Sequence, residues 1–167
     1  MKTFAHINAA GGVVGIGMIY LESGSFTEPV ADQVAALGED AGIKAYGDSV
    51  RQDPALTTIV IDTAQMPGGS AMGYDKMFRG AFRHGGGLKV AVDMPTARLI
   101  AHDARRKKRA AEMAPLDIQA SIPAQATAAE AARQKIRDKY AVIQTQIDGA
   151  LDDLALKNLV TAMLARP

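Results

Sequence analysis

Residues 93–117 read DMPTARLIAHDARRKKRAAEMAPLD. The first of them suit the start of a helix: the Asp93 carboxylate can accept from the free amides of a first turn, and Pro95 lacks an amide that would be unbonded there. Between Thr96 and Met113 no Gly or Pro interrupts a run of good helix formers. Because the residue before a proline is disfavoured in a helix, we expect this helix to end before Pro115.

Five consecutive cations lie within this helix: Arg105, Arg106, Lys107, Lys108 and Arg109. At about 100° per residue they circle the helix, so at least one must bury its methylenes along a packed surface. Two interpretations stay open. The run is either a patch for an acidic protein partner or nucleic acid, or a solvated face near the helix C-terminus, where cations suit the dipole. The solvated face is favoured, and nucleic acid is the weakest hypothesis, because no aromatic residue lies beside the run to stack on bases.

The composition of the 167 residues fits one domain, or one small domain with a helical extension. Hydrophobic residues make up 48% but aromatic residues only 5%, so the core is thin and docking on a partner or self-association is favoured. A net charge of +1 argues against a generally nucleic-acid-binding protein. Since there is no cysteine, disulfides and thiolate metal sites are excluded. We find no signal-peptide core and no membrane span, and expect a soluble chain made in the cytosol.

The front half shows strand patterns. Thr3–Asn8 and Val13–Tyr20 flank a Gly-containing turn, which predicts a β-hairpin. Gly15 and Gly17 lie two residues apart and so share one strand face. They leave that face bare, which predicts the close approach of another backbone or side chain and makes both glycines candidate partner-binding positions.

Further along, residues 26–37 suit a short helix that opens near Thr27-Glu28-Pro29, and residues 40–54, which are polar with two glycines, suit a loop with short elements. Residues 56–62, LTTIVID, give the strongest strand pattern in the chain. Residues 83–87 predict a turn, and residues 88–93 alternate apolar and polar side chains as a half-buried strand does.

The back half is helical. Thr127-Ala128-Ala129-Glu130 matches a capping box and predicts the start of a second long helix. Its apolar face contains Ile136, Tyr140, Ile143 and Ile147. Internal packing of this face is favoured over a role as an interface. Asp152 or Asp153 can cap a short last helix with the apolar residues Leu154, Leu156, Leu159, Val160, Met163 and Leu164. The predicted fold is α+β: a β-rich domain with a small antiparallel sheet in residues 1–93, then a helical hairpin and short closing helix in residues 94–167.

The sequence predicts no catalytic, cofactor-binding or metal-binding residues, and we expect no enzyme. The glycines at 11–17 lack the order of a phosphate-binding loop and sit in a strand pattern. Ser70 has Gly68 two residues before it but Met72 two residues after it, so the nucleophile-elbow pattern fails. The three histidines, His6, His84 and His102, are dispersed, without metal-ligand spacing.

Several short motifs nevertheless form a recognisable series: Met66-Pro67, the segment FRGAF at 78–82, the segment VAVDMP at 90–95, Ala97-Arg98 and Leu116-Asp117. Over residues 61–117 this series resembles a family of small proteins encoded in tailed-bacteriophage and prophage genomes. The segment QKIRD at 134–138 loosely matches that family's second helix. The C-terminal hairpin also resembles, distantly, that of tail-fibre assembly proteins. The chain departs from the family pattern at Phe82, where Trp is usual, and at residues 118–126, and the resemblance does not reach residues 1–50.

The resemblance implies a non-catalytic structural protein of a phage tail, associated with fibres or baseplate, present in the virion and, during assembly, in the host cytoplasm. Its partners would be other phage tail proteins or a second copy of the chain, without cofactor, membrane or nucleic acid. Two alternatives stay open: a tail-fibre assembly chaperone absent from the mature particle, and a small cytosolic nucleic-acid-binding regulator that uses the basic helix. The candidate partner-binding residues are Arg105, Arg106, Lys107, Lys108, Arg109, Gly15 and Gly17.

Overall fold

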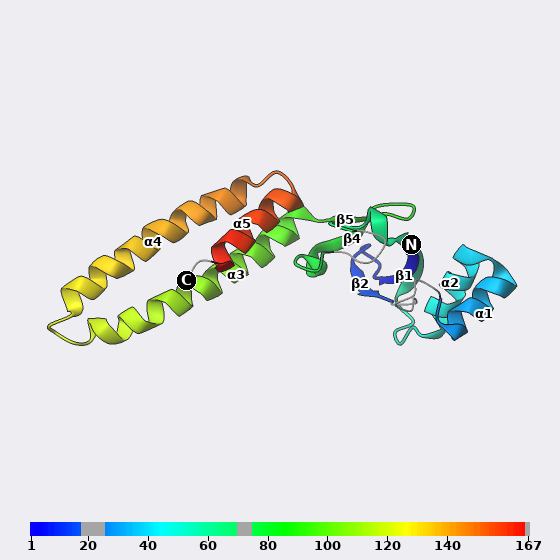
Figure 1. The fold of residues 1–167 in the computed structure, drawn as a ribbon, viewed down its shortest axis with the longest axis horizontal. Coiled ribbons are helices and arrows are strands. Elements are labelled where there is room, and N and C mark those ends of the chain that lie inside the picture. Colours follow the sequence, from blue (N-terminus) through cyan, green and yellow to red (C-terminus); the bar gives the residue numbers. More distant parts are fainter. Residues whose placement is uncertain (18–25, 70–74, 166–167) are drawn as a thin grey trace. The chain divides into compact units, whose positions relative to one another are not determined.

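The computed structural model describes residues 1–17, 26–69 and 75–165. The chain divides into two compact units, Met1–Asp93 and Met94–Pro167. The first contains a small antiparallel sheet with two helices, and the second contains a long helical hairpin with a shorter third helix (Figure 1). The predicted α+β fold class is confirmed.

A three-stranded antiparallel sheet forms the centre of the first unit. Its strands are β1 (Lys2–Ile7), β2 (Val13–Ile16) and β3 (Thr57–Asp62), in the order β2-β1-β3. The predicted hairpin and the predicted strand at 56–62 are both confirmed. Residues 18–20, the end of the expected second strand, lie outside the described residues.

Two local features fix the β1–β2 turn. The Asn8 side-chain oxygen accepts hydrogen bonds from the amides of Ala10 at 3.1 Å and Gly12 at 2.9 Å. Gly11 has φ +76°, a left-handed conformation that glycine adopts without a steric penalty. The glycines that superficially suggest a phosphate loop therefore belong to a hairpin.

Two helices, α1 (Glu28–Leu37) and α2 (Glu39–Ser49), pack against each other, and α2 also packs on β1 and β3. The first helix begins after Thr27 as predicted. Residues 40–54, expected as a loop with short elements, instead lie mostly in the single helix α2. A Cβ on Gly42 would lie 2.5 Å from the backbone of Val34, and one on Gly47 would lie 2.6 Å from the Thr58 methyl group. These glycines permit close packing, although their low helix propensity resembles a loop signal.

The two faces of the sheet carry separate small cores, because successive strand residues point to opposite faces. On the helix side Phe4 packs with Val30 and Ile43. On the other side Ala5 and Ile61 belong to a buried cluster that also contains Met66, Phe82 and Val90. Neither of these two cores is large, in keeping with the low aromatic content.

A second, two-stranded sheet completes this unit. Strand β4 (Phe82–His84) pairs with β5 (Val90–Val92) in antiparallel fashion, and Phe82 lies opposite Val92. Short 3₁₀ turns, η1 (Thr63–Gln65) and η2 (Arg79–Ala81), precede it. The predicted turn and strand are confirmed, but the strand is shorter than the expected 88–93. Residue 88 lies in the turn, where its carbonyl accepts from the Asp62 amide at 2.9 Å.

The first long helix, α3, spans Met94–Ala120 and runs through Pro115. The prediction that it ends before this proline is wrong. A proline inside a helix leaves the carbonyl four residues earlier, here that of Ala111, without its amide donor. Both residues are exposed, so water can replace the missing donor and the helix continues for another turn.

The second long helix, α4, spans Ala126–Gly149 with Gln125 at its N-cap position. The predicted capping box is wrong, because Thr127 lies inside the first turn. The Ala129 amide already donates to the Gln125 carbonyl at 2.9 Å. Alanine favours the helix strongly, so the helix extends back to the turn that joins it to α3.

The inner face of α4 packs on α3 as predicted. Tyr140, Ile143 and Ile147 are buried, and Ile136 is half-buried. The stripe at helical spacing is therefore internal packing, which confirms that interpretation for its three buried members.

The short helix α5 (Asp153–Ala165) packs against both long helices. Asp152 caps it, since its Oδ1 accepts from the Ala155 amide at 2.7 Å, which confirms one of the two predicted caps. Its buried residues are Leu156, Val160 and Met163. Of the other predicted apolar residues, Leu154 and Leu164 are exposed, because only one face of α5 packs against α3 and α4.

Candidate interaction surfaces

The basic run lies in the middle of α3, and its first member faces α4. Nη1 of Arg105 donates to the Tyr140 carbonyl oxygen at 3.3 Å. Burial, and then the nearby cations Arg109 and Arg106, lower the pKa of the Arg105 guanidinium. One of the five cations therefore lies along a packed surface, as the helical periodicity predicts.

The next two cations form local ion pairs on the exposed side of α3. Nη2 of Arg106 lies 3.4 Å from Asp103 Oδ1, and Nζ of Lys107 lies 2.7 Å from Asp103 Oδ2. The hydrogen bond from Lys107 lowers the pKa of Asp103. Such exposed pairs at helical spacing contribute little to stability, but they partly neutralise this side of the run.

The last two cations, Lys108 and Arg109, are half-buried, and within the described part of the chain neither forms an ion pair. Lys108 follows Ala97, Ala101 and Ala104 at spacings of four, three and four, so it continues their stripe along the helix. Lys108 lies one turn before Glu112, and its charge helps to lower the pKa of that carboxyl, so this cation is partly balanced on the side of α3 where the small alanines pack.

The position of the run also differs from the expectation. It does not lie near the C-terminus of its own helix, because α3 continues to Ala120. Helix α5 runs in the same direction as α3 and ends beside the middle of α3 (Figure 1). The carbonyl end of a helix is the negative end of its dipole. The cations in the middle of α3 are therefore favourably placed for the C-terminal end of α5.

A second group of polar side chains ties α3 to α4 next to the run. Tyr140 Oη donates to Glu112 Oε1 at 2.8 Å, and Lys139 Nζ lies 3.0 Å from both carboxylate oxygens. Burial by itself raises the pKa of Glu112, but the hydrogen bonds from Lys139 and Tyr140 outweigh it, and the net pKa lies below the ordinary value. Burial, and then the bond to Glu112, raise the pKa of the Tyr140 phenol.

Further cross-helix contacts follow along the hairpin. Arg98 Nη2 donates to the Ala150 carbonyl at 2.9 Å, near the end of α4. Nearer the tip, Arg133 Nη2 lies 3.2 Å from Asp117 Oδ1. These contacts cannot be predicted from the sequence, because the partners are far apart in the chain and no local spacing marks them.

The two candidate glycines, Gly15 in β2 and Gly17 just after it, differ in their surroundings. A Cβ on Gly17 would overlap the ring of Phe4, so the predicted close approach is confirmed there. At Gly15 nothing lies within 4 Å of the Cβ position, so the described part of the chain does not approach it closely, and its role as a partner-binding position stays a prediction.

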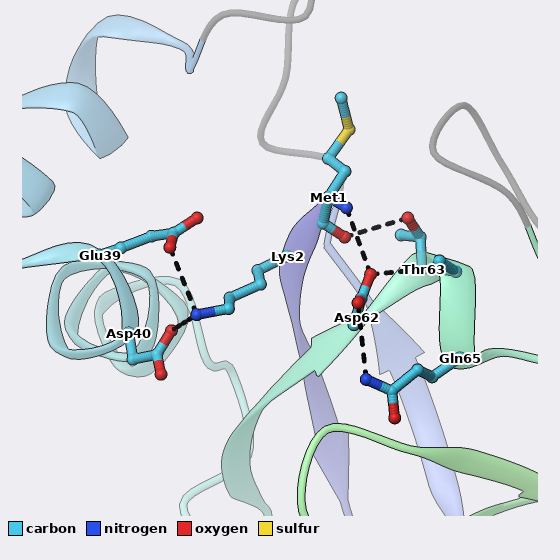
Figure 2. A network of polar contacts seen from close by, with 8 residues as sticks. Met1, Lys2, Glu39, Asp40, Asp62, Thr63 and Gln65 are labelled. Atoms are coloured by element: carbon cyan, nitrogen blue, oxygen red, sulfur yellow. Dashed lines mark hydrogen bonds and ion pairs between the residues drawn. The ribbon is translucent and has the colours of Figure 1, made fainter.

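In the first unit, polar contacts hold the start of β1 to its neighbours (Figure 2). Lys2 Nζ reaches the first turn of α2, 2.7 Å from Asp40 Oδ1 and 3.3 Å from Glu39 Oε2. On the other side, the Met1 ammonium lies 3.2 Å from Asp62 Oδ1. The hydrogen bond from the Ala64 amide, and then that ammonium, lower the pKa of Asp62. These contacts join the sheet to the helix and to η1.

The structure brings none of the histidines together. His6 Nε2 lies 3.0 Å from the Gly47 carbonyl, His84 Nε2 lies 3.0 Å from the Gly87 carbonyl, and His102 Nε2 lies 2.9 Å from Asp148 Oδ1. Among the described residues no group of His, Asp and Glu has metal-binding geometry. Ser70 lies outside the described residues.

The residues of the phage-like motifs occupy structural positions. Phe78, Ala81 and Phe82 are buried in the first unit, and Val92 lies opposite Phe82 in the β4–β5 pair. In the second unit Ala97 is buried, and Arg98 and Asp117 make the cross-helix contacts described above.

Comparison with family models, curated proteins and solved structures returned no match for this chain. Within the described residues, no helix is both long enough and apolar enough to cross a membrane.

Proposed function

We propose that this chain is a non-catalytic structural protein of the tail of a tailed bacteriophage, associated with fibres or baseplate. One observation carries the proposal: residues of the motifs that resemble the phage family make contacts between neighbouring elements of the fold. Phe82 and Val92 pair in the β4–β5 hairpin, and Arg98 joins the start of α3 to the end of α4. The motifs that resemble that family thus occupy structural positions. This suits a protein that acts by binding other proteins.

The shape of the second unit supports the same proposal. The α3–α4 hairpin extends beyond α5, and several large apolar side chains of this unit are exposed, namely Leu99, Ile118, Val142, Leu151 and Leu154. A thin core with exposed apolar side chains is typical of a component that is completed by its neighbours in an assembly.

The test is mass spectrometry of purified particles from a host that carries the gene, with the copy number measured against the capsid protein. We expect a fixed, low copy number in intact particles. Particles from a tailless mutant are the control, and the chain should be lost from them together with the known tail proteins. A chain that is present in the lysate but absent from intact particles would contradict the structural role and support the assembly-chaperone alternative.

A further inference from the structure

Helix α5 buries one face and leaves the opposite face exposed. The buried residues Leu156, Val160 and Met163 follow one another at spacings of four and three, on the side that packs against α3 and α4. At about 100° per residue, positions 154, 158, 161 and 165 lie opposite them, and all four are exposed in the part of the chain that the structure describes. These positions, the outer stripe of α5, are Leu154, Asn158, Thr161 and Ala165.

The exposed side of α5 differs from that of the other helices in its lack of charge. Every exposed residue of α5 is uncharged, and Leu154 is 63% exposed. Each of the other four α-helices that the structure describes exposes charged side chains, for example Glu28, Glu39, Arg106 and Lys135. The cores of protein interfaces are depleted of charged residues, so the outer stripe has the composition of an interface.

The order of side chains along the outer stripe is complementary to itself when two copies run antiparallel. In the register centred between positions 158 and 161, Leu154 of one helix faces Ala165 of the other, and Asn158 faces Thr161. A large side chain then meets a small one at both ends, and in the middle an amide meets a hydroxyl with which it can hydrogen-bond. A parallel pair would instead place two leucines together at one end and two alanines at the other, where the packing would leave a gap.

Charge also favours a second copy over a charged partner. A partner with charged groups against the outer stripe would lose their hydration without gaining an ion pair. The two charged residues of α5, Asp153 and Lys157, are half-buried and opposite in sign, so two α5 helices approach each other without a net charge of their own. The uncharged surface of α5 therefore matches another uncharged surface, and the same stripe of a second copy supplies one.

We propose that the outer stripe of α5 is the interface of a homodimer, in which the α5 helices of two copies pack antiparallel about a two-fold axis between positions 158 and 161. Such an interface is isologous, because each copy contributes the same surface. One pair of helices makes a small contact, so the dimer dissociates on dilution. The inference goes beyond the proposed function and does not depend on it, so the failure of either leaves the other unaffected.

Sedimentation velocity of the purified full chain over a range of concentrations measures this association. We expect an equilibrium between monomer and dimer. The variant L154E should weaken it at least about tenfold, because each dimer would bury two carboxylates without partners. The matched control is L99E on α3, since Leu99 is 65% exposed and Leu154 63%. L99E should change the dissociation constant less than about twofold.

Circular dichroism checks that both variants keep their helix content. A chain that stays monomeric at its highest soluble concentration would overturn the proposal. If L154E then also lowered the melting temperature, the outer stripe would be assigned to a contact within the chain. Equal loss of association in the two variants would overturn the proposal as well, because the dimer would not depend on the outer stripe.

The direction of the helix pair is tested with single cysteines, because the chain has none of its own. The variants L154C and A165C are purified separately and oxidised alone or as a mixture. We expect a disulfide between the two variants in the mixture. L154C alone should form one far more slowly, because its two copies lie about 16 Å apart along the antiparallel pair. Rapid oxidation of L154C alone, without a mixed disulfide, would show a parallel pair and overturn the proposal.

Discussion

Tyr140 Oη donates to Glu112 Oε1 at 2.8 Å, and the next residue, Lys139, places its ammonium 3.0 Å from both oxygens of the same carboxylate. This cluster joins α3 to α4 between the base and the tip of the hairpin. Polar contacts and buried apolar side chains occur together along its length, from the Arg98–Ala150 hydrogen bond at the base to buried Ala129 and the Arg133–Asp117 ion pair nearer the tip.

Replacing Tyr140 with Phe tests the phenol contact. The ring stays and the hydrogen bond to a charged carboxylate is lost, so we expect the free energy of unfolding to fall by about 1.5–3 kcal/mol. Urea unfolding followed by circular dichroism measures this. The matched control is Y46F in α2, a tyrosine whose ring meets Phe4 edge-on. An equal effect of the two substitutions would contradict the special role of Tyr140.

The low pKa of Glu112 predicts an acid-sensitive hairpin. Because the folded-state pKa lies below the ordinary value, ionised Glu112 contributes stability above about pH 4.5, and this contribution is lost as the pH falls through the folded-state pKa. We expect E112Q to lower stability at neutral pH and the gap from the wild type to narrow in acid. Thermal unfolding across pH 3–7 checks this.

The exposed Glu130 provides the control for that titration, since E130Q removes a carboxylate that pairs only at the surface, with Arg137 and Arg133. The hydrogen bond from Arg137 also lowers the pKa of Glu130, but this pair lies at the surface and is screened by solvent, so the gap between E130Q and the wild type should change less with pH than the gap for E112Q. A constant gap between E112Q and the wild type at every pH would show that Glu112 acts by shape and not by charge.

Glycine substitutions distinguish the two candidate positions, Gly15 in β2 and Gly17 just after it. G17A places a methyl group against the Phe4 ring and should destabilise the first unit by about 1–3 kcal/mol. G15A adds the same group where nothing lies within 4 Å and should stay within about 0.5 kcal/mol of the wild type. Thermal melts of both variants measure the difference. Similar melting temperatures would mean that Phe4 moves aside at low cost.

The N-cap of α5 offers a further test of a local contact. D152A removes the side chain that accepts from the Ala155 amide and should destabilise the hairpin by about 1 kcal/mol. D152N should restore most of the loss, because Asn is as good an N-cap as Asp. If Asn and Ala behave alike, the carboxylate acts through its charge at the helix N-terminus and not through the hydrogen bond.

The local sequence by itself determined the β1–β2 hairpin, the strand at 57–62, the buried stripe of Tyr140, Ile143 and Ile147, and the Asp152 cap. Each depends on residues close together in the chain, whose periodicity or turn chemistry holds whatever surrounds them. The position of one cation of the basic run on a packed surface also follows from periodicity alone.

Only the tertiary structure decided the remaining features. Gly42 and Gly47 favour a loop by propensity, yet packing against Val34 and Thr58 makes them helical. Pro115 is a local signal for the end of a helix and Thr127 for the start of one, yet both residues lie inside helices in the structure. The hydrogen bonds from Tyr140 to Glu112 and from Arg98 to Ala150 join residues that are 28 and 52 positions apart. Such pairs exist only once the helices are side by side, because their energy comes from groups that no local pattern brings together.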